Sequence, residues 1–75
     1  MSEKLPVVEG GRLVRALKRA GFEVVRIRGS AHSMEHFDGR RTSVHVHAGT
    51  TIKPGTLASI LDDAGMTADD LRALL

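Results

Sequence analysis

The chain has 75 residues, no cysteine, two aromatic residues and a formal net charge of +2, which indicates one small domain over residues 1–75, near the lower size limit for folding alone. The composition excludes a disulfide framework and thiol chemistry, and two phenylalanines disfavour a single-strand binder that stacks bases on aromatic rings. No apolar run could cross a membrane and no signal-peptide pattern is present, so we expect a cytoplasmic protein.

An amphipathic helix is predicted over roughly residues 11–20, because Leu13, Ala16, Leu17 and Ala20 recur at helical spacing. The preceding residues 1–8 are expected to be extended, since Pro6 opposes a helix there. The outer face of this helix is basic and carries Arg12, Arg15, Lys18 and Arg19. Such a stripe fits a solvated surface and a phosphate-contacting surface equally well.

Residues 22–28 are rich in β-branched side chains and predict a strand. A hairpin follows, because Asp38-Gly39 lies between two runs that have strand character. A two-residue loop at Asp38-Gly39 would pair Phe37 with Arg40 and His32 with His45. A four-residue loop keeps this parity, whereas a three-residue loop would flip one strand and separate the histidines.

All four histidines of the chain lie in this hairpin. Side chains alternate along a strand, and with the two-residue loop one face holds His32, Met34, His36, Arg41, Ser43, His45 and His47. The other face then holds Ala31, Phe37, Val44 and Val46, which are suited to meet a core. We therefore expect the histidines on the solvent-exposed face of the sheet.

The last third of the chain predicts helices. Leu57, Ile60, Leu61 and Ala64 have helical spacing, and Gly65 follows as a stop signal. Residues 67–70 resemble a capping box with Asp70 in the acidic position, which predicts a short final helix. The resulting order is α-β-β-β-α with a small terminal helix, an α+β fold with helices on one face of a three-stranded antiparallel sheet.

Three roles are open for the histidine cluster. A metal site is disfavoured, because the spacing matches no zinc signature and no cysteine contributes, and we expect no cofactor. Exposed histidines without a role are the plain alternative. General acid–base chemistry is the third, because imidazole holds both protonation states near neutral pH and RNA cleavage needs a proton removed and a proton donated. Arg26, Arg28, Arg41 and Lys53 are candidates to steady the phosphate.

Nearly the whole chain resembles the HicA toxin family in one colinear order. The matching segments are residues 20–26, Gly29-Ser30-x-His32, residues 38–41, Val44-x-Val46-His47, residues 52–61 and Ala64-Gly65. The resemblance implies a fold similar to the double-stranded-RNA-binding domain. It also implies a metal-independent ribonuclease that cleaves mRNA, and a HicB-like antitoxin that covers its active site.

Charge and sequence position indicate the residues that would bind RNA, and the resemblance indicates the segment that would hold the catalytic histidine. The RNA-binding candidates are Arg12, Arg15, Lys18, Arg19, Arg26, Arg28, Ser30, Arg41, His47 and Lys53. In the family the catalytic histidine lies in the Gly-Ser-His segment that opens the second strand. Here Ala31 and His32 occupy that segment, and proline is frequent in the family where this chain has His45.

Positions 31 and 32 give two opposed hypotheses. Either His32 is catalytic, or Ala31 replaces the catalytic histidine and the chain is inactive. Adjacent strand residues face opposite sides, so only one of the two positions can share a face with His45 and His47. The two-residue loop favours His32, while the family pattern favours position 31, and a different loop length or a bulge would reconcile the pattern with the geometry.

Overall fold

The computed structural model describes residues 4–75, so the first three residues of the expected extended lead-in lie outside the described part. The elements follow in the order α1 (Gly10–Arg19), β1 (Phe22–Arg28), β2 (Ala31–His36), β3 (Arg41–His45), α2 (Pro54–Ala64) and α3 (Ala68–Leu74). The predicted α+β order, with its small terminal helix, is confirmed. The three strands form one antiparallel sheet in the order β1-β2-β3.

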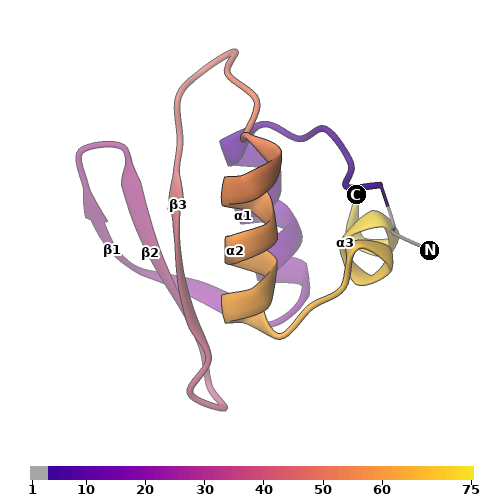
Figure 1. Ribbon diagram of the computed structural model, residues 1–75. Helices are drawn as coiled ribbons and strands as arrows, with labels where there is room; N and C mark the ends of the chain where they lie inside the picture. The colour runs from indigo at the N-terminus through magenta and orange to yellow at the C-terminus, as the bar shows by residue number, and fades with distance from the viewer. Residues whose placement is uncertain (1–3) are drawn as a thin grey trace.

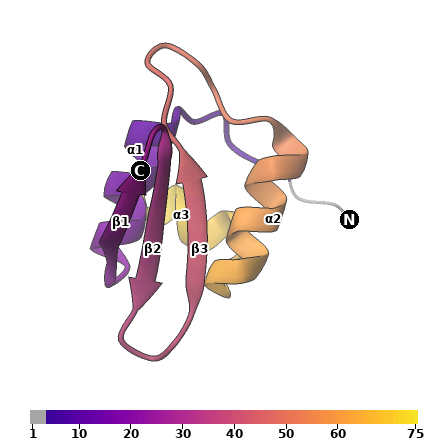
Figure 2. The same ribbon diagram turned by 90° about the vertical axis from the view of Figure 1, so that its left-hand side faces the viewer.

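The elements stack in three layers, with the sheet on one side, α1 and α2 against it, and α3 beyond them (Figure 1). Turned by a quarter, the opposite face of the sheet lies open to the viewer and no helix crosses it (Figure 2). The core between sheet and helices includes Leu13 and Leu17 of α1, Met34 of β2, Val44 of β3 and Leu57 of α2, all fully buried. Burying each such side chain stabilises the fold by about 1.5–3 kcal/mol.

The β2–β3 hairpin differs from the prediction by one residue. The amide of His36 donates to the carbonyl of Arg40 (2.9 Å) and the amide of Gly39 to the carbonyl of His36 (2.9 Å), so the loop contains three residues, 37–39. Gly39 has a φ of 99°, the left-handed conformation that closes a three-residue hairpin loop. The Asp-Gly pair therefore marked the turn correctly, but the predicted two-residue loop was wrong.

The one-residue slip reverses one strand relative to the predicted face. Ala31 pairs with His45, His32 with Val44, Ser33 with Ser43, and Met34 with Thr42. Cross-strand partners share a face, so His32 and His36 lie on the helix side with Met34. His45 and His47 lie on the open side. The predicted face with all four histidines is thus corrected, as is the expectation that Ala31 points to the core.

A β-bulge at Val25 determines where the arginines of β1 point. The pairing shifts from Val24 opposite Met34 to Arg26 opposite Ser33, which leaves Val25 unpaired. Without this extra residue, Arg26 and Arg28 would share the buried face of Phe22, because all have the same parity. The bulge turns both arginines to the open face.

Phe37, which was expected to meet the core, lies in the hairpin loop and is 93% exposed. The predicted signals at the helix ends are confirmed. Gly65 ends α2 in the left-handed conformation, and Thr67 and Asp70 form the expected capping box of α3. Leu71 of α3 is fully buried, and Arg19 of α1 donates a hydrogen bond to the carbonyl of Leu74 at 2.6 Å. Within residues 4–75, no helix is long and apolar enough to cross a membrane.

Candidate active site

The open face of the sheet presents its side chains in three cross-strand rows. The first row contains Arg28, Ala31 and His45, the second Arg26, Ser33 and Ser43, and the third Glu23, Glu35 and Arg41. The side chains in the middle of the first two rows are small. Ala31 lies between Arg28 and His45, and Ser33 lies between Arg26 and Ser43. The acidic residues lie only in the third row, so positive charge is concentrated at the end of the sheet where Ala31 lies.

Ala31 is the central residue of the first row. Its backbone pairs with that of His45, and paired residues of an antiparallel sheet have their Cα atoms about 4.5–5.5 Å apart with both side chains on one face. An imidazole at position 31 would therefore stand directly beside the imidazole of His45. The methyl group of Ala31 leaves that position without a titratable group.

His45 is oriented by two neighbours on the open face. Its Nδ1 lies 3.2 Å from the hydroxyl oxygen of Ser30, and its ring stacks on that of His47 with centroids 6.5 Å apart and an angle of 8° between planes. Both histidines are exposed. Because Ser30 engages Nδ1, Nε2 is the ring nitrogen of His45 that remains for a ligand.

His32 and His36 have local partners on the helix side. The Nδ1 of His32 lies 3.1 Å from the carbonyl oxygen of Ser30, so it serves as the donor, and the side chain is partly buried. His36 packs edge-on against Phe22 at 5.1 Å and accepts the amide hydrogen of Asp38 at 3.2 Å. These contacts stabilise the hairpin, and they separate both rings from the His45–His47 pair.

The basic stripe of α1 is divided by the fold. Arg12 and Arg15 line a pocket together with His47, next to the open face. Arg19 instead binds the carbonyl of Leu74, and Lys18 lies exposed in the last turn of α1. Of the stripe, Arg12 and Arg15 thus line the pocket that His47 also lines, whereas Lys18 and Arg19 do not line it.

Lys53 lies near the histidine pair on the other side. It lines a groove of about 310 Å³ with His45, His47 and residues of α2. Ser30 contacts both histidine groups. Its hydroxyl forms a hydrogen bond with His45, and its carbonyl oxygen accepts hydrogen bonds from His32 and from the amide of Val46 (2.8 Å). Of the predicted RNA-binding residues, Arg26, Arg28, Ser30, His47 and Lys53 therefore surround the Ala31 row, and Arg41 lies at the far end.

His45 was absent from the predicted site. The signal that would have identified it is the parity argument applied to a three-residue loop, which places position 31 and His45 opposite one another. No group of three metal-ligating side chains that could hold an ion is found among residues 4–75.

Comparison with known proteins gives one family. The profile described as the HicA toxin of bacterial toxin–antitoxin systems matches residues 10–66, from the first residue of α1 to just past α2. No curated protein matches the chain. The matched segment contains the whole sheet, and it includes Ala31, His45 and His47.

Proposed function

The chain belongs to the HicA toxin family, and on that premise we propose that it is a metal-independent endoribonuclease of mRNA whose catalytic position, residue 31, is occupied by alanine. In this form it binds RNA on the open face of the sheet without cleaving it. The observation that supports the proposal is the pairing of Ala31 with His45 on the face that also carries Arg28.

With histidine at position 31, two imidazoles would flank one phosphate. One would take the proton of the 2′-hydroxyl, whose oxygen attacks the neighbouring phosphorus. The bond from phosphorus to the 5′-oxygen would break, and the second imidazole would give that oxygen a proton. The products are a 2′,3′-cyclic phosphate and a 5′-hydroxyl end. Arg26 and Arg28 would stabilise the charge that develops on the phosphate.

The competing assignment, His32 as catalytic residue, has less support. Its Nδ1 faces the Ser30 carbonyl (3.1 Å) and its pairing with Val44 sets it on the helix side of the sheet. On that side the sheet separates the ring of His32 from His45 and His47, which lie on the open face. The structural role that these contacts suggest is to fix the turn before β2.

Three forms of the protein test the assignment: this chain, Ala31→His, and His32→Ala, each incubated with a labelled single-stranded RNA. We expect only Ala31→His to cleave, with a rate at least about 10²–10⁴-fold above the others, which is the usual contribution of a positioned acid or base. Ala31→Asn is the matched control, since it adds a polar side chain of comparable reach that does not titrate near neutral pH. Cleavage by this chain that is abolished in His32→Ala would overturn the assignment.

A second series tests the partner imidazole. Adding His45→Ala to the Ala31→His form should reduce cleavage by a similar factor while leaving RNA affinity nearly unchanged. If neither histidine change affects the products and both forms still bind RNA, the alternative function holds, a non-catalytic RNA- or protein-binding domain on the same fold. The observation that favours this alternative is that position 31 has no imidazole.

Binding is tested separately from cleavage. Removal of one cation that meets a phosphate of single-stranded RNA should reduce the slope of log K against log salt by about 0.7. Arg12→Ala with Arg15→Ala should therefore flatten the slope by more than Lys18→Ala with Arg19→Ala, because only the first pair lines the pocket that His47 also lines. Equal slopes for both double variants would remove α1 from the RNA-binding surface.

The second partner that we propose is a HicB-like antitoxin that covers the open face. The exposed histidines and arginines there suit an acidic partner surface. Hydrogen exchange of the complex should show added protection in β2 and β3. Protection confined to the helices, with the hairpin unchanged, would contradict an antitoxin that blocks the active site.

A further inference from the structure

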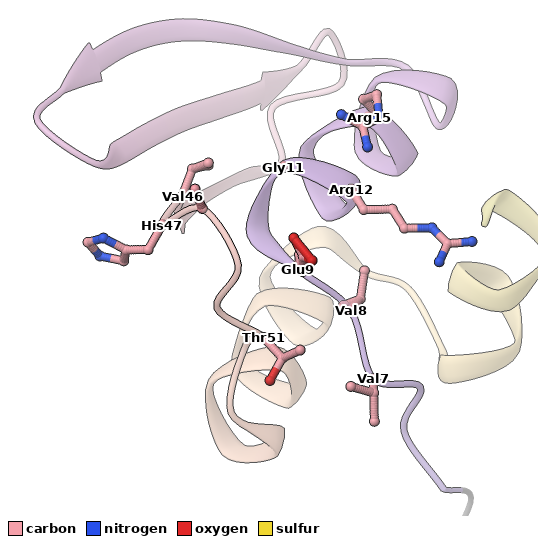
Figure 3. A pocket seen from close by; sticks show the side chains of 10 residues that line it. Val7, Val8, Glu9, Gly11, Arg12, Arg15, Val46, His47 and Thr51 are labelled. Atoms are coloured by element: carbon pink, nitrogen blue, oxygen red, sulfur yellow. The ribbon is translucent and has the colours of Figure 1, made fainter.

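A second concave site lies beside the proposed active site and takes no part in the proposed mechanism. It has a volume of about 370 Å³, near the lower end of the range of about 300–1,000 Å³ for ligand pockets. Its walls come from the segment before α1, the first two turns of α1, and the segment after β3 (Figure 3). Backbone contacts join these segments, because Glu9 pairs with Thr51 and the amide of Ile52 donates to the carbonyl of Val8 at 2.9 Å.

One part of the pocket is apolar and partly exposed to solvent. Val7 is 78% exposed, an unusual fraction for a large aliphatic side chain in this protein, and Val46 is only partly buried. Both line the pocket with the buried Val8. A flat apolar group placed there would cover valine surface that now meets solvent.

The other part carries two opposite charges that are not paired with each other. An Nη atom of Arg15 lies 3.9 Å from the position that a Cβ on Gly11 would occupy. The guanidinium of Arg15 therefore lies next to Gly11, which has no side chain. Glu9 lines the same pocket. Among residues 4–75, neither side chain forms an ion pair or a side-chain hydrogen bond. Arg12 contributes its stem, and its guanidinium extends away from His47 (Figure 3).

We propose that this pocket binds one unpaired nucleotide of the RNA and prefers guanine. The phosphate would meet Arg15, the flat base would cover the valines, and the carboxylate of Glu9 would accept two hydrogen bonds from the base edge. Guanine is the common base whose Watson–Crick edge presents two adjacent donors, N1–H and N2–H, which match the two oxygens of a carboxylate. Proteins commonly read unpaired bases through their Watson–Crick edges.

The position of the pocket connects it to the proposed cleavage site, and the inference rests on that proposed function for its role. His47 lines the pocket, and its ring stacks on His45, which pairs with position 31. A nucleotide in the pocket would therefore be a neighbour of the scissile phosphate. The pocket would set which base flanks the cleavage point.

The test uses the chain as it stands, with 5′-GMP, 5′-AMP, 5′-CMP, 5′-UMP and inorganic phosphate as probes in titrations followed by ¹⁵N-resolved NMR. We expect GMP to shift the amides of residues 7–15 and 46–51. Its affinity should exceed that of the other nucleotides by about 5- to 150-fold, the range for a good pair of base hydrogen bonds.

Two variants separate the contacts. Glu9→Gln should bring GMP affinity close to that of the other nucleotides, and Arg15→Gln should weaken all four nucleotides by a similar factor. Lys18→Gln is the matched control, because it removes a charge from the same helix away from the pocket, and it should change neither value. Glu9 makes no side-chain cap for α1, so Glu9→Gln is expected to fold normally.

The outcomes also separate this inference from the proposed ribonuclease. Equal binding of all four nucleotides, shifts located elsewhere, or inorganic phosphate binding as tightly as GMP would overturn the guanine pocket. RNA cleavage by Ala31→His without preference for guanine beside the cut would overturn the pocket and leave the ribonuclease intact. Specific GMP binding with no cleavage by Ala31→His would support the pocket and overturn the ribonuclease.

Discussion

At Gly10, α1 packs tightly against the backbone of His45 and Val46. A Cβ added to Gly10 would lie 2.6 Å from the backbone oxygen of His45 and 3.0 Å from the Cα of Val46. Ordinary contact begins at 3.4 Å, so Gly10→Ala would force α1 and β3 apart by about 0.8 Å. Both clashing atoms belong to the backbone, and neither can rotate away. Overpacking of this kind costs about 1–3 kcal/mol.

Gly11 provides the matched control in the same turn of the helix. A Cβ there would meet only Arg15 and Val46 side chains, at 3.9 and 4.0 Å, which is ordinary contact. Gly11→Ala should therefore leave stability unchanged or raise it by up to about 1 kcal/mol through helix propensity. The two alanine variants have identical composition, so their difference reports the close approach of α1 to β3.

Thermal and urea unfolding followed by circular dichroism would measure that difference. The two variants should differ by about 1–4 kcal/mol in unfolding free energy. For a domain of this size 1 kcal/mol corresponds to roughly 4–8 °C in Tm, so Gly10→Ala should melt about 4–32 °C below Gly11→Ala. In the folded Gly10→Ala protein the amide signals of His45 and Val46 should also shift, because the added Cβ would contact the backbone of both residues. If both variants melt together, the tight packing of α1 on β3 is refuted, and so is its role in holding the His45–His47 segment.

Two further predictions concern the hairpin tip and α3. Hydrogen bonds from the Arg40 side chain hold the pKa of Asp38 below its usual value of 3.8, so Asp38 stabilises the fold above that pH and loses this effect as pH falls through its lowered pKa. Asp38→Asn should therefore reduce the unfolding free energy at pH 6 and converge with the parent in acid; parallel curves at every pH would contradict this. Thr67→Ala removes the oxygen that accepts the Asp70 amide hydrogen at 3.0 Å and should cost about 1 kcal/mol in urea unfolding, whereas Thr50→Ala, in an exposed loop, should cost almost nothing; equal losses would reject the cap.

The order and type of the elements were encoded in local sequence. The spacing of Leu13, Ala16 and Leu17 matched α1 to within one residue at each end, and residues 22–28 coincide with β1. Gly65 and the Thr67–Asp70 capping box marked helix ends through local backbone chemistry, which does not depend on distant residues. The family resemblance, confirmed over residues 10–66, also came from the sequence.

The composition of the open face was determined only by tertiary structure. The Asp38-Gly39 pair is compatible with a two-residue loop and with a three-residue loop. The choice between the two loops depends on which face of each strand meets the core. Met34 and Val44 are both fully buried, and only the three-residue loop brings them to one face. That register moves His32 to the helix side and sets Ala31 beside His45.

The bulge at Val25 is a second feature of this kind. It turns Arg26 and Arg28 outward although Phe22, of the same parity, is buried. Because the side-chain period of a strand is two residues, one extra residue in a loop or strand reverses every later side chain. Local propensity identifies the strands, but the energy that decides between neighbouring registers comes from burial against α1 and α2, which the chain gains only when the sheet and helices pack together.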